Sequence, residues 1–441
     1  MHQRDFFPKI KTSDNQPYIS RYTKTSENLE YEKKPNKALR ARSKPKTKIR
    51  VGSLFSGIGG FEKALDLLNI QTDIKFAVDN DKNVKKFYFQ NHDIRPDDWY
   101  DCADDFSSSH AKKFRGQIDL LVGGPPCQPF SLAFGANKSK GVRDDRSNLI
   151  FTYTEILKKC KPSFFIFENV KSLVSIHEGR LWDQLIYQMK SAGYDNLYWD
   201  VLNAKDYGVP QSRQRIYLIG FKNSEIKYKF PQILPLSVTL RDLLEKKDVS
   251  SKYFLTKKGV EFVTKQINTQ KKRTQVTHMS NSKKNIALCQ TARQLSNWHG
   301  DFIEVGKNKY ETSYDGYMAR YSLSDSVQDF VLKPGSRNYH AAPKLDQEVA
   351  KTILSTSHKM HRAGIDNYIK LKDNKYLSNR KIRKLTPREC MNLMGWINRN
   401  YNPIKFKRSD ISDTEIYRQT GNSVVVWVVA HILALVPYNE L

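Results

Sequence analysis

Metal-binding and disulfide patterns are missing from this 441-residue sequence. The cysteines form no Cys-x-x-Cys pair, and no histidine-rich neighbour stands at zinc-finger spacing; they are Cys102, Cys127, Cys160, Cys289 and Cys390. We therefore expect no metal site. An odd number of cysteines without a secretory leader fits reduced thiols, so we expect a cytoplasmic protein.

Long apolar runs are also missing. No run reaches the roughly 18 residues of a membrane span, and the N-terminal segment MHQRDFFPKI has no apolar signal core. We expect no contact with a membrane. Hydrophobic residues nevertheless make up 39% of the chain, which is enough to bury a sizeable core and excludes a disordered protein.

Acidic side chains are scarce relative to basic ones. The chain has 46 Asp and Glu residues against 74 Lys and Arg residues, a net charge of +28 and a pI of about 9.7. This excess points to a polyanionic partner, and nucleic acid is the leading candidate. The alternative is a soluble protein that is merely basic, because charge selects a class of partner and not a chemistry.

The first 48 residues are polar, and the stretch from Lys33 to Arg50 has no acidic residue at all. We interpret residues 1–48 as a disordered basic arm. Such an arm can contact DNA phosphates without reading sequence, or it can be a solvated tail. The sequence leaves both alternatives open.

From residue 49 short apolar runs alternate with amphipathic segments, which predicts a doubly wound α/β domain with a mostly parallel sheet. The expected strands are Arg50 to Phe55, Lys75 to Val78, Ile118 to Val122, Ser163 to Phe167, Leu197 to Leu202 and Arg215 to Phe221. The expected helices are Phe61 to Leu68, Lys82 to Gln90, Asn148 to Lys158 and Gly179 to Ala192. This catalytic domain should span residues 49–235.

The alternation stops after Pro235. Residues 236–376 are rich in Lys, Asn, Ser and Thr, which predicts a second, less regular domain. The α/β pattern returns in residues 377–441, where Ser423 to Val436 reads as a buried helix after a Gly421-Asn422 turn. The second domain is therefore expected to be an insertion, with residues 377–441 completing the first.

A glycine-rich loop, SLFSGIGG at residues 53–60, follows the first expected strand. Such a loop lets the backbone approach a ligand at the carboxyl edge of a sheet, although many nucleotide-binding folds share it. Asp79 and Asp81 follow the second strand, where an acid can accept hydrogen bonds from a ribose diol. The alternative is that the acid caps the next helix, and it applies more to Asp81 than to Asp79. Asp105 stands where an acid can meet an adenine amino group.

The segment GGPPCQPFS at residues 123–131 follows an apolar strand. Its prolines stiffen a loop that can continue neither as a strand nor as a helix, so Cys127 is held at the sheet edge. An inert buried cysteine would need no such frame. We therefore interpret Cys127 as a reactive thiol.

Two further elements add polar groups. Glu168 ends a buried strand beside the thiol loop, where burial raises a carboxyl pKa and prepares it to share a proton; the alternative is a helix cap. In QSRQR, residues 211–215, strand alternation places Arg213 and Arg215 on one face, so that both guanidinium groups aim the same way. A solvated basic face is the alternative.

The ordered motifs SLFSGIGG, GGPPCQPFS, FENV, QSRQR and QTGNS resemble those of bacterial and phage DNA (cytosine-5) methyltransferases, over residues 49 to 222 and 380 to 436. The resemblance implies S-adenosyl-L-methionine as cofactor and Cys127 as nucleophile, with Glu168 as the partner of the cytosine amino group and N3. It also implies that Arg213 and Arg215 secure the base and its flanking phosphate. The implied cofactor-binding residues are Phe55, Gly57, Gly59, Asp79, Asp105, Pro125, Asn422 and Ser423. Members of the family often have Glu where this sequence has Asp79, whose side chain is one methylene shorter.

The same resemblance implies a mechanism in which a cytosine is rotated out of double-stranded DNA and Cys127 adds to its C6. Residues 236–376 would be the target-recognition domain, and the segment from Arg380 to Trp396 would pack against it. We expect a monomer in a bacterial cytoplasm, possible partnership with a cognate restriction endonuclease, and a recognition sequence that the motifs do not specify.

Four other functions were weighed against this one. An RNA cytosine-5 methyltransferase shares the PPCQ and ENV elements, and duplex DNA compared with tRNA as acceptor separates the two. A catalytically silent DNA-binding protein would fail to bind the cofactor. An amino-methyltransferase is disfavoured, because the chain has no Asn/Asp-Pro-Pro-aromatic tetrapeptide, and a dehydrogenase would rest on the glycine loop alone.

Overall fold

The computed structural model describes residues 39–126, 145–245, 253, 302–305, 350–351, 381–396 and 411–441. Within these residues, no helix is both long enough and apolar enough to cross a membrane.

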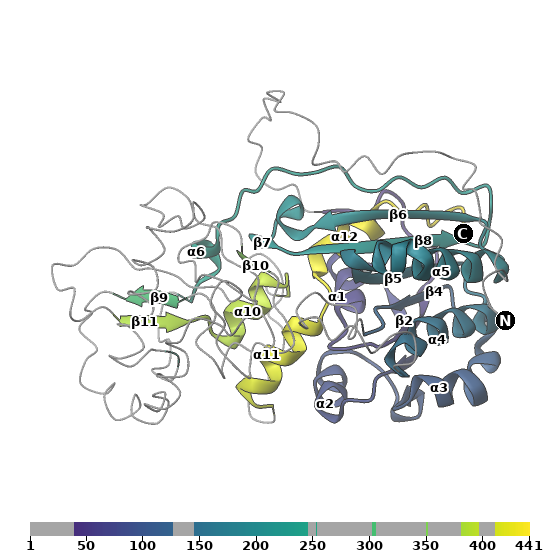
Figure 1. Ribbon diagram of the computed structural model, residues 1–441, viewed down its shortest axis with the longest axis horizontal. Coiled ribbons are helices and arrows are strands. Elements are labelled where there is room, and N and C mark those ends of the chain that lie inside the picture. Colours follow the sequence, from purple (N-terminus) through teal and green to yellow (C-terminus); the bar gives the residue numbers. More distant parts are fainter. Residues whose placement is uncertain are drawn as a thin grey trace, which may run out of the picture.

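A seven-stranded sheet forms the centre of the molecule, with the strand order β3-β2-β1-β4-β5-β8-β6 (Figure 1). Its strands are β1 (Ile49–Leu54), β2 (Thr72–Val78), β3 (Trp99–Tyr100), β4 (Leu120–Gly123), β5 (Phe164–Val170), β6 (Asn196–Asn203) and β8 (Gln214–Phe221). Neighbouring strands are parallel except at β8, which runs antiparallel to both β5 and β6. This confirms the mostly parallel sheet, and the six expected strands are all present.

Side-chain alternation along the strands divides the core into two layers. In β5, Phe164 and Ile166 face one apolar cluster, with helices α1 (Gly60–Leu67) and α12 (Val426–Ala434). Phe165 and Phe167 face the other, with α4 (Asp145–Cys160) and α5 (Arg180–Ser191). Because successive strand residues point to opposite faces, both faces of the sheet are covered (Figure 1). Each fully buried large side chain contributes about 1.5–3 kcal/mol.

Helix α2 (Lys82–Asn91) lies beside the β2–β3 edge of the sheet, where Val84 and Tyr88 pack against Ile74 and Trp99. The four expected helices correspond to α1, α2, α4 and α5 within a few residues. Strand β3 has only two residues, which is too short to show a period of two in the sequence.

The C-terminal segment differs in detail from the expectation. Helix α11 (Asp413–Asn422) includes Gly421 and Asn422 as its last residues, so they end a helix and do not form a separate turn. Ser423 then breaks the helix, and α12 follows, buried as expected. Helix α12 packs on α1, which brings the end of the chain back to the glycine-rich loop.

The described parts of the inserted region contact the catalytic domain at several places. Strand β9 (Phe302–Val305) pairs antiparallel with β11 (Lys381–Lys384), away from the main sheet in Figure 1. Strand β10 (Ala350–Lys351) pairs with β7 (Gln211–Ser212). Helix α10 (Pro387–Leu393) meets the entrance of the insertion, where Asn392 donates to the Leu243 carbonyl of α6 (Leu240–Leu243).

Residues 39–48 differ from the disordered arm expected for residues 1–48. The Arg42 amide donates to the Ala434 carbonyl at 2.7 Å, and Ser43 Oγ accepts from the Tyr438 amide at 2.9 Å. Leu39 packs against the apolar core. This correction follows from tertiary contacts that the polar composition of the segment does not reveal.

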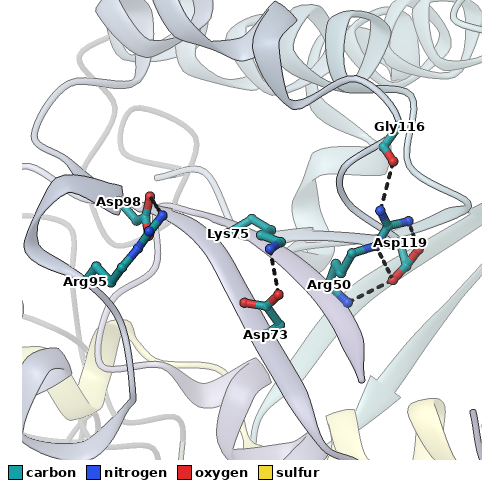
Figure 2. Close-up of polar contacts among 7 residues, drawn as sticks. All are labelled: Arg50, Asp73, Lys75, Arg95, Asp98, Gly116 and Asp119. Atoms are coloured by element: carbon teal, nitrogen blue, oxygen red, sulfur yellow. Dashed lines mark hydrogen bonds and ion pairs between the residues drawn. The ribbon is translucent and has the colours of Figure 1, made fainter. Parts of the chain in front are cut away.

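Ion pairs lie along the edge of the sheet where the parallel strands begin (Figure 2). Arg50 binds the Asp119 carboxylate through Nε (3.0 Å), Nη2 (2.6 Å) and its own amide (2.9 Å), which joins the starts of β1 and β4. Asp73 and Lys75 form a pair on β2. The active-site residues lie at the opposite edge.

Candidate active site

The candidate site residues follow the carboxyl ends of the parallel strands. The glycine-rich loop follows β1, Asp79 follows β2, and Gly124 to Pro126 follow β4. Glu168 lies two residues before the end of β5. Strand β8 is antiparallel to β5, so its first residues lie at this same edge, with Arg215 opposite Val170. The sheet topology therefore collects segments that are far apart in the sequence.

The backbone of the glycine-rich loop turns sharply. Phe55, Gly57 and Gly59 all have positive φ values, of 51°, 54° and 82°. The Ser56 hydroxyl accepts from the Val78 amide at 3.0 Å, which ties the loop to the end of β2. Gly59 has an additional requirement, because a Cβ atom there would lie 2.0 Å from the His92 ring.

Asp79 binds the glycine-rich loop directly. Its Oδ2 accepts from the Gly57 amide at 2.9 Å, and its Oδ1 accepts from the Asp81 amide at 3.0 Å. Burial of the carboxyl raises the pKa of Asp79 to about 6, opposed by these two backbone hydrogen bonds. Asp79 is therefore oriented by the loop and caps no helix.

Asp81 has the capping role that the sequence left open. Its Oδ1 accepts from the amides of Asn83 and Val84 at the start of α2, at 2.8 and 3.2 Å. Its other oxygen forms an ion pair with Arg418 of α11. Asp81 thus joins the second strand to the C-terminal segment.

The space at Gly57 fits a bound cofactor. Among the described residues, a Cβ atom at Gly57 would meet only the Phe55 carbonyl oxygen, at 3.9 Å, so none of them fills the space beside this backbone. A glycine backbone with a carboxylate beside it suits the polar portion of a nucleoside ligand. These residues fit S-adenosyl-L-methionine.

The other residues expected at the cofactor lie at different depths. Ser423 is buried and lies beside the start of α1, where a Cβ on Gly60 would be 3.1 Å from the Ser423 Oγ. Asn422 is exposed at the end of α11, and Asp105 is exposed in α3 (Ala103–Asp105). Pro125 is buried in the loop after β4.

The thiol loop begins against β5. A Cβ on Gly124 would lie 2.9 Å from Glu168 Oε2, so only glycine lets the chain pass this close to the carboxyl. Asn169 donates from Nδ2 to the Pro125 carbonyl at 3.1 Å. Cys127, two residues further on, lies outside the described residues.

Glu168 is buried, with 8% of its surface exposed. Burial raises the pKa of its carboxyl, while the charges of Arg215 and Arg213 oppose the rise. Arg215 Nε lies 3.3 Å from Glu168 Oε1. A buried carboxyl with a raised pKa can hold a proton near neutral pH.

The two arginines bind different partners. Arg213 lies between β7 and β8 and donates from Nη2 to the carbonyl oxygens of Gly421 and Ser423. Arg215 forms an ion pair with Glu168. Both charges act on the Glu168 carboxyl, so the two guanidinium groups lie near one acid although they bind different groups.

Sequence reasoning missed Asn169 and Arg418. Asn169 belongs to the FENV motif, and its hydrogen bond to the Pro125 carbonyl ties the loop after β4 to β5. Arg418 precedes the QTGNS motif and stands three residues after Glu415, with which it also pairs. The sequence signal for Arg418 was only a charge in a polar helix, which is usually solvated.

Comparison with known proteins identifies the family. The family described as C-5 cytosine-specific DNA methylase matches residues 49–436. The orphan methyltransferase M.SPRI of Bacillus phage SPR is 28% identical over 445 residues, covering 87% of this chain and 96% of that protein. The type II methyltransferase M.HpaII of Haemophilus parainfluenzae is also 28% identical, covering 85% of each chain.

The fold has a similar match among solved structures. The Dnmt2 methyltransferase of S. pombe superposes with a TM-score of 0.53 at 20% identity, covering 88% of this chain and 98% of that one. Because the family match spans most of the sequence, the chain belongs to the C-5 cytosine-specific DNA methylases and has their DNA cytosine-5 methyltransferase activity.

Proposed function

We propose that the protein methylates C5 of a cytosine flipped out of double-stranded DNA, through a covalent adduct with Cys127. The observation that carries this proposal is the position of Glu168. Its carboxyl is buried, paired with Arg215 and next to Gly124, where the chain leads into Cys127. A proton source beside a thiol loop is what addition to a pyrimidine ring requires.

Cys127 starts the reaction as a thiolate, because a thiolate is a strong nucleophile. Its sulfur forms a bond to cytosine C6, and the C5–C6 π electrons move so that C5 becomes nucleophilic. S-adenosyl-L-methionine, when bound, supplies the methyl group as an electrophilic sulfonium. Loss of the C5 proton to a base then re-forms the C5–C6 double bond and expels the Cys127 thiolate.

Glu168 acts on the pyrimidine ring during the addition. In its protonated form it donates to N3 as negative charge develops there, and its position can also serve the amino group. Arg215 holds the carboxyl in place through its 3.3 Å ion pair. The positive charge of Arg213 also acts on the Glu168 carboxyl, while its guanidinium donates to the Ser423 carbonyl of the C-terminal segment.

The target base must leave the duplex, because the thiol cannot reach C6 within a base stack. Rotating the base out costs a few kcal/mol, which contacts with the protein offset. Residues 236–376 form the target-recognition domain in this proposal, and their basic side chains read guanine edges and bind phosphates. A monomeric enzyme, a cytoplasmic location and a cognate restriction endonuclease belong to the same proposal.

Bisulfite sequencing of DNA from cells expressing the protein tests this function. Wild-type protein should protect cytosines within one short recognition sequence, and Cys127→Ser should protect none. Methylation that persists in Cys127→Ser would contradict the nucleophile. Purified protein that methylates tRNA and not duplex DNA would contradict the DNA substrate.

A further inference from the structure

Arg418 links two parts of the cofactor site that lie far apart in the sequence. It projects from α11, four residues and therefore about one helical turn before Asn422. Its guanidinium forms ion pairs with Asp81 of the β2–α2 loop and with Glu415 of its own helix. Its Nε also donates to Glu415 Oε2 at 2.9 Å.

The contact at Asp81 continues to Asp79 and the glycine-rich loop. The Asp81 amide donates to Asp79 Oδ1 at 3.0 Å, and Asp79 Oδ2 accepts from the Gly57 amide at 2.9 Å. Arg418 therefore fixes Asp81, and the Asp81 backbone fixes the rotamer of Asp79. This chain of contacts is short and only partly exposed, with 27% of the Arg418 side chain and 17% of the Asp81 side chain open to solvent.

The link between Arg418 and Asp79 is also electrostatic. Asp79 and Asp81 are two carboxylates close in space, and the charge of Asp81 raises the pKa of Asp79. Arg418 acts in the opposite direction on Asp79 and also lowers the pKa of Asp81. The charged groups that act on the Asp79 carboxyl are thus Asp81 from the start of α2 and Arg418 from α11, with Glu415 engaging Arg418 from the side.

We propose that Arg418 is a positioning residue for the cofactor: through Asp81 it holds the Asp79 carboxyl in place as the acceptor for a ribose diol. This inference rests on the proposed cofactor, since it assigns Asp79 to the ribose of S-adenosyl-L-methionine. An ionised carboxylate accepts hydrogen bonds from both ribose hydroxyls, whereas a protonated one has lost an acceptor site. Cofactor affinity should then fall as the pH falls through the Asp79 pKa of about 6.

Calorimetric titration of the full-length protein with S-adenosylhomocysteine, between about pH 5 and pH 8, tests the inference without turnover. Arg418→Gln should weaken binding about tenfold at pH 7. It should also move the pH at which affinity is half lost upward from the wild-type value of about 6, because a positive charge near Asp79 is lost. Arg418→Lys keeps the positive charge and should hold that pH close to the wild-type value.

Two further variants separate positioning from general damage. Asp81→Asn can still cap α2, but it removes the like charge beside Asp79, so it should move the half-loss pH downward, opposite to Arg418→Gln. Arg95→Gln removes an arginine from a comparable i,i+3 ion pair with Asp98, near the edge shown in Figure 2, and should leave the cofactor titration unchanged.

The outcomes distinguish this inference from the proposed function. Wild-type protein that fails to bind S-adenosylhomocysteine would overturn the cofactor assignment itself. Wild-type binding together with an unchanged affinity and pH profile in Arg418→Gln would overturn the role of Arg418 alone. A loss of affinity in Arg418→Gln that is equal at every pH would also overturn it, because that result describes only structural damage.

Discussion

Arg213, which precedes the insertion in the sequence, donates hydrogen bonds to two carbonyl oxygens that follow the insertion, those of Gly421 at 3.1 Å and Ser423 at 2.7 Å. These carbonyls lie at the end of α11, where helix carbonyls lack partners within the helix and favour a positive charge. The buried guanidinium thus joins the two sequence segments that the insertion separates.

Arg213→Met should destabilise the protein by about 2–4 kcal/mol, because it removes a charged donor and leaves two buried carbonyls without it. Urea denaturation measures the change. Arg213→Lys should recover part of the loss, since one ammonium can still reach a carbonyl. A change in Arg213→Met below about 0.5 kcal/mol, the range of surface substitutions, would contradict this role.

Glu168 predicts a specific pH dependence of the methyl transfer rate. Burial raises the pKa of Glu168, and the proposed mechanism uses the protonated form. The rate constant under single turnover should therefore fall as the pH rises through that raised pKa. Glu168→Gln should reduce the rate by about 10²–10⁴-fold and remove this decline, because an amide donates a hydrogen bond but transfers no proton. A decline that persists in Glu168→Gln would assign it to another group.

Tyr88 and Glu62 form a buried pair beneath the glycine-rich loop, with Tyr88 Oη donating to Glu62 Oε1 at 2.7 Å. Glu62 Oε2 has no hydrogen-bond partner among the described residues. Tyr88→Phe should therefore cost about 1–3 kcal/mol in unfolding free energy, by leaving a buried carboxyl unsatisfied. Thermal unfolding of Tyr88→Phe, Glu62→Met and the double variant should show the double variant less destabilised than the sum. Simple additivity would show that the pair does not interact.

Gly59 and Gly116 provide a matched pair for the cost of a side chain in the glycine-rich loop. Both have positive φ, 82° and 75°, but a Cβ on Gly116 would meet none of the described residues within 4 Å, whereas one on Gly59 would overlap His92. Gly116→Ala should cost about 1 kcal/mol from backbone strain. Gly59→Ala should cost about 1–3 kcal/mol more, measured by chemical denaturation. His92→Ala should relieve most of that excess in the Gly59→Ala background, and no relief would place the clash elsewhere.

Arg50 should stabilise the edge of the sheet where β1 and β4 begin (Figure 2). Its pair with Asp119 is bidentate, and its Nη1 also donates to the Gly116 carbonyl at 3.0 Å. Because the Arg50 side chain is 40% exposed, solvent screens the pair, and Arg50→Gln should cost about 1 kcal/mol. The loss should shrink in high salt. Arg95→Gln, whose side chain is 82% exposed in its pair with Asp98, should change the unfolding midpoint less than Arg50→Gln does.

Local patterns were sufficient for much of the fold and for the identity of the site segments. The short apolar run of β5 and the apolar spacing of α5 depend only on residues close in the sequence, so six strands and four helices were predicted correctly. The motifs after the strands identified Asp79 and Glu168 for the same reason, since the carboxyl ends of parallel strands meet at one edge.

Only the tertiary structure decided how charged side chains are paired. The sequence did not decide which of Asp79 and Asp81 caps the next helix, and it predicted Arg213 and Arg215 on one strand face without naming their partners. The structure gives Asp81 to α2 and Arg418, and it turns Arg213 toward Ser423 and Arg215 toward Glu168. A long charged side chain has many possible partners at similar local cost, and its choice depends on which distant segment lies within reach. The antiparallel direction of β8 and the return of α11 to β2 determine that reach.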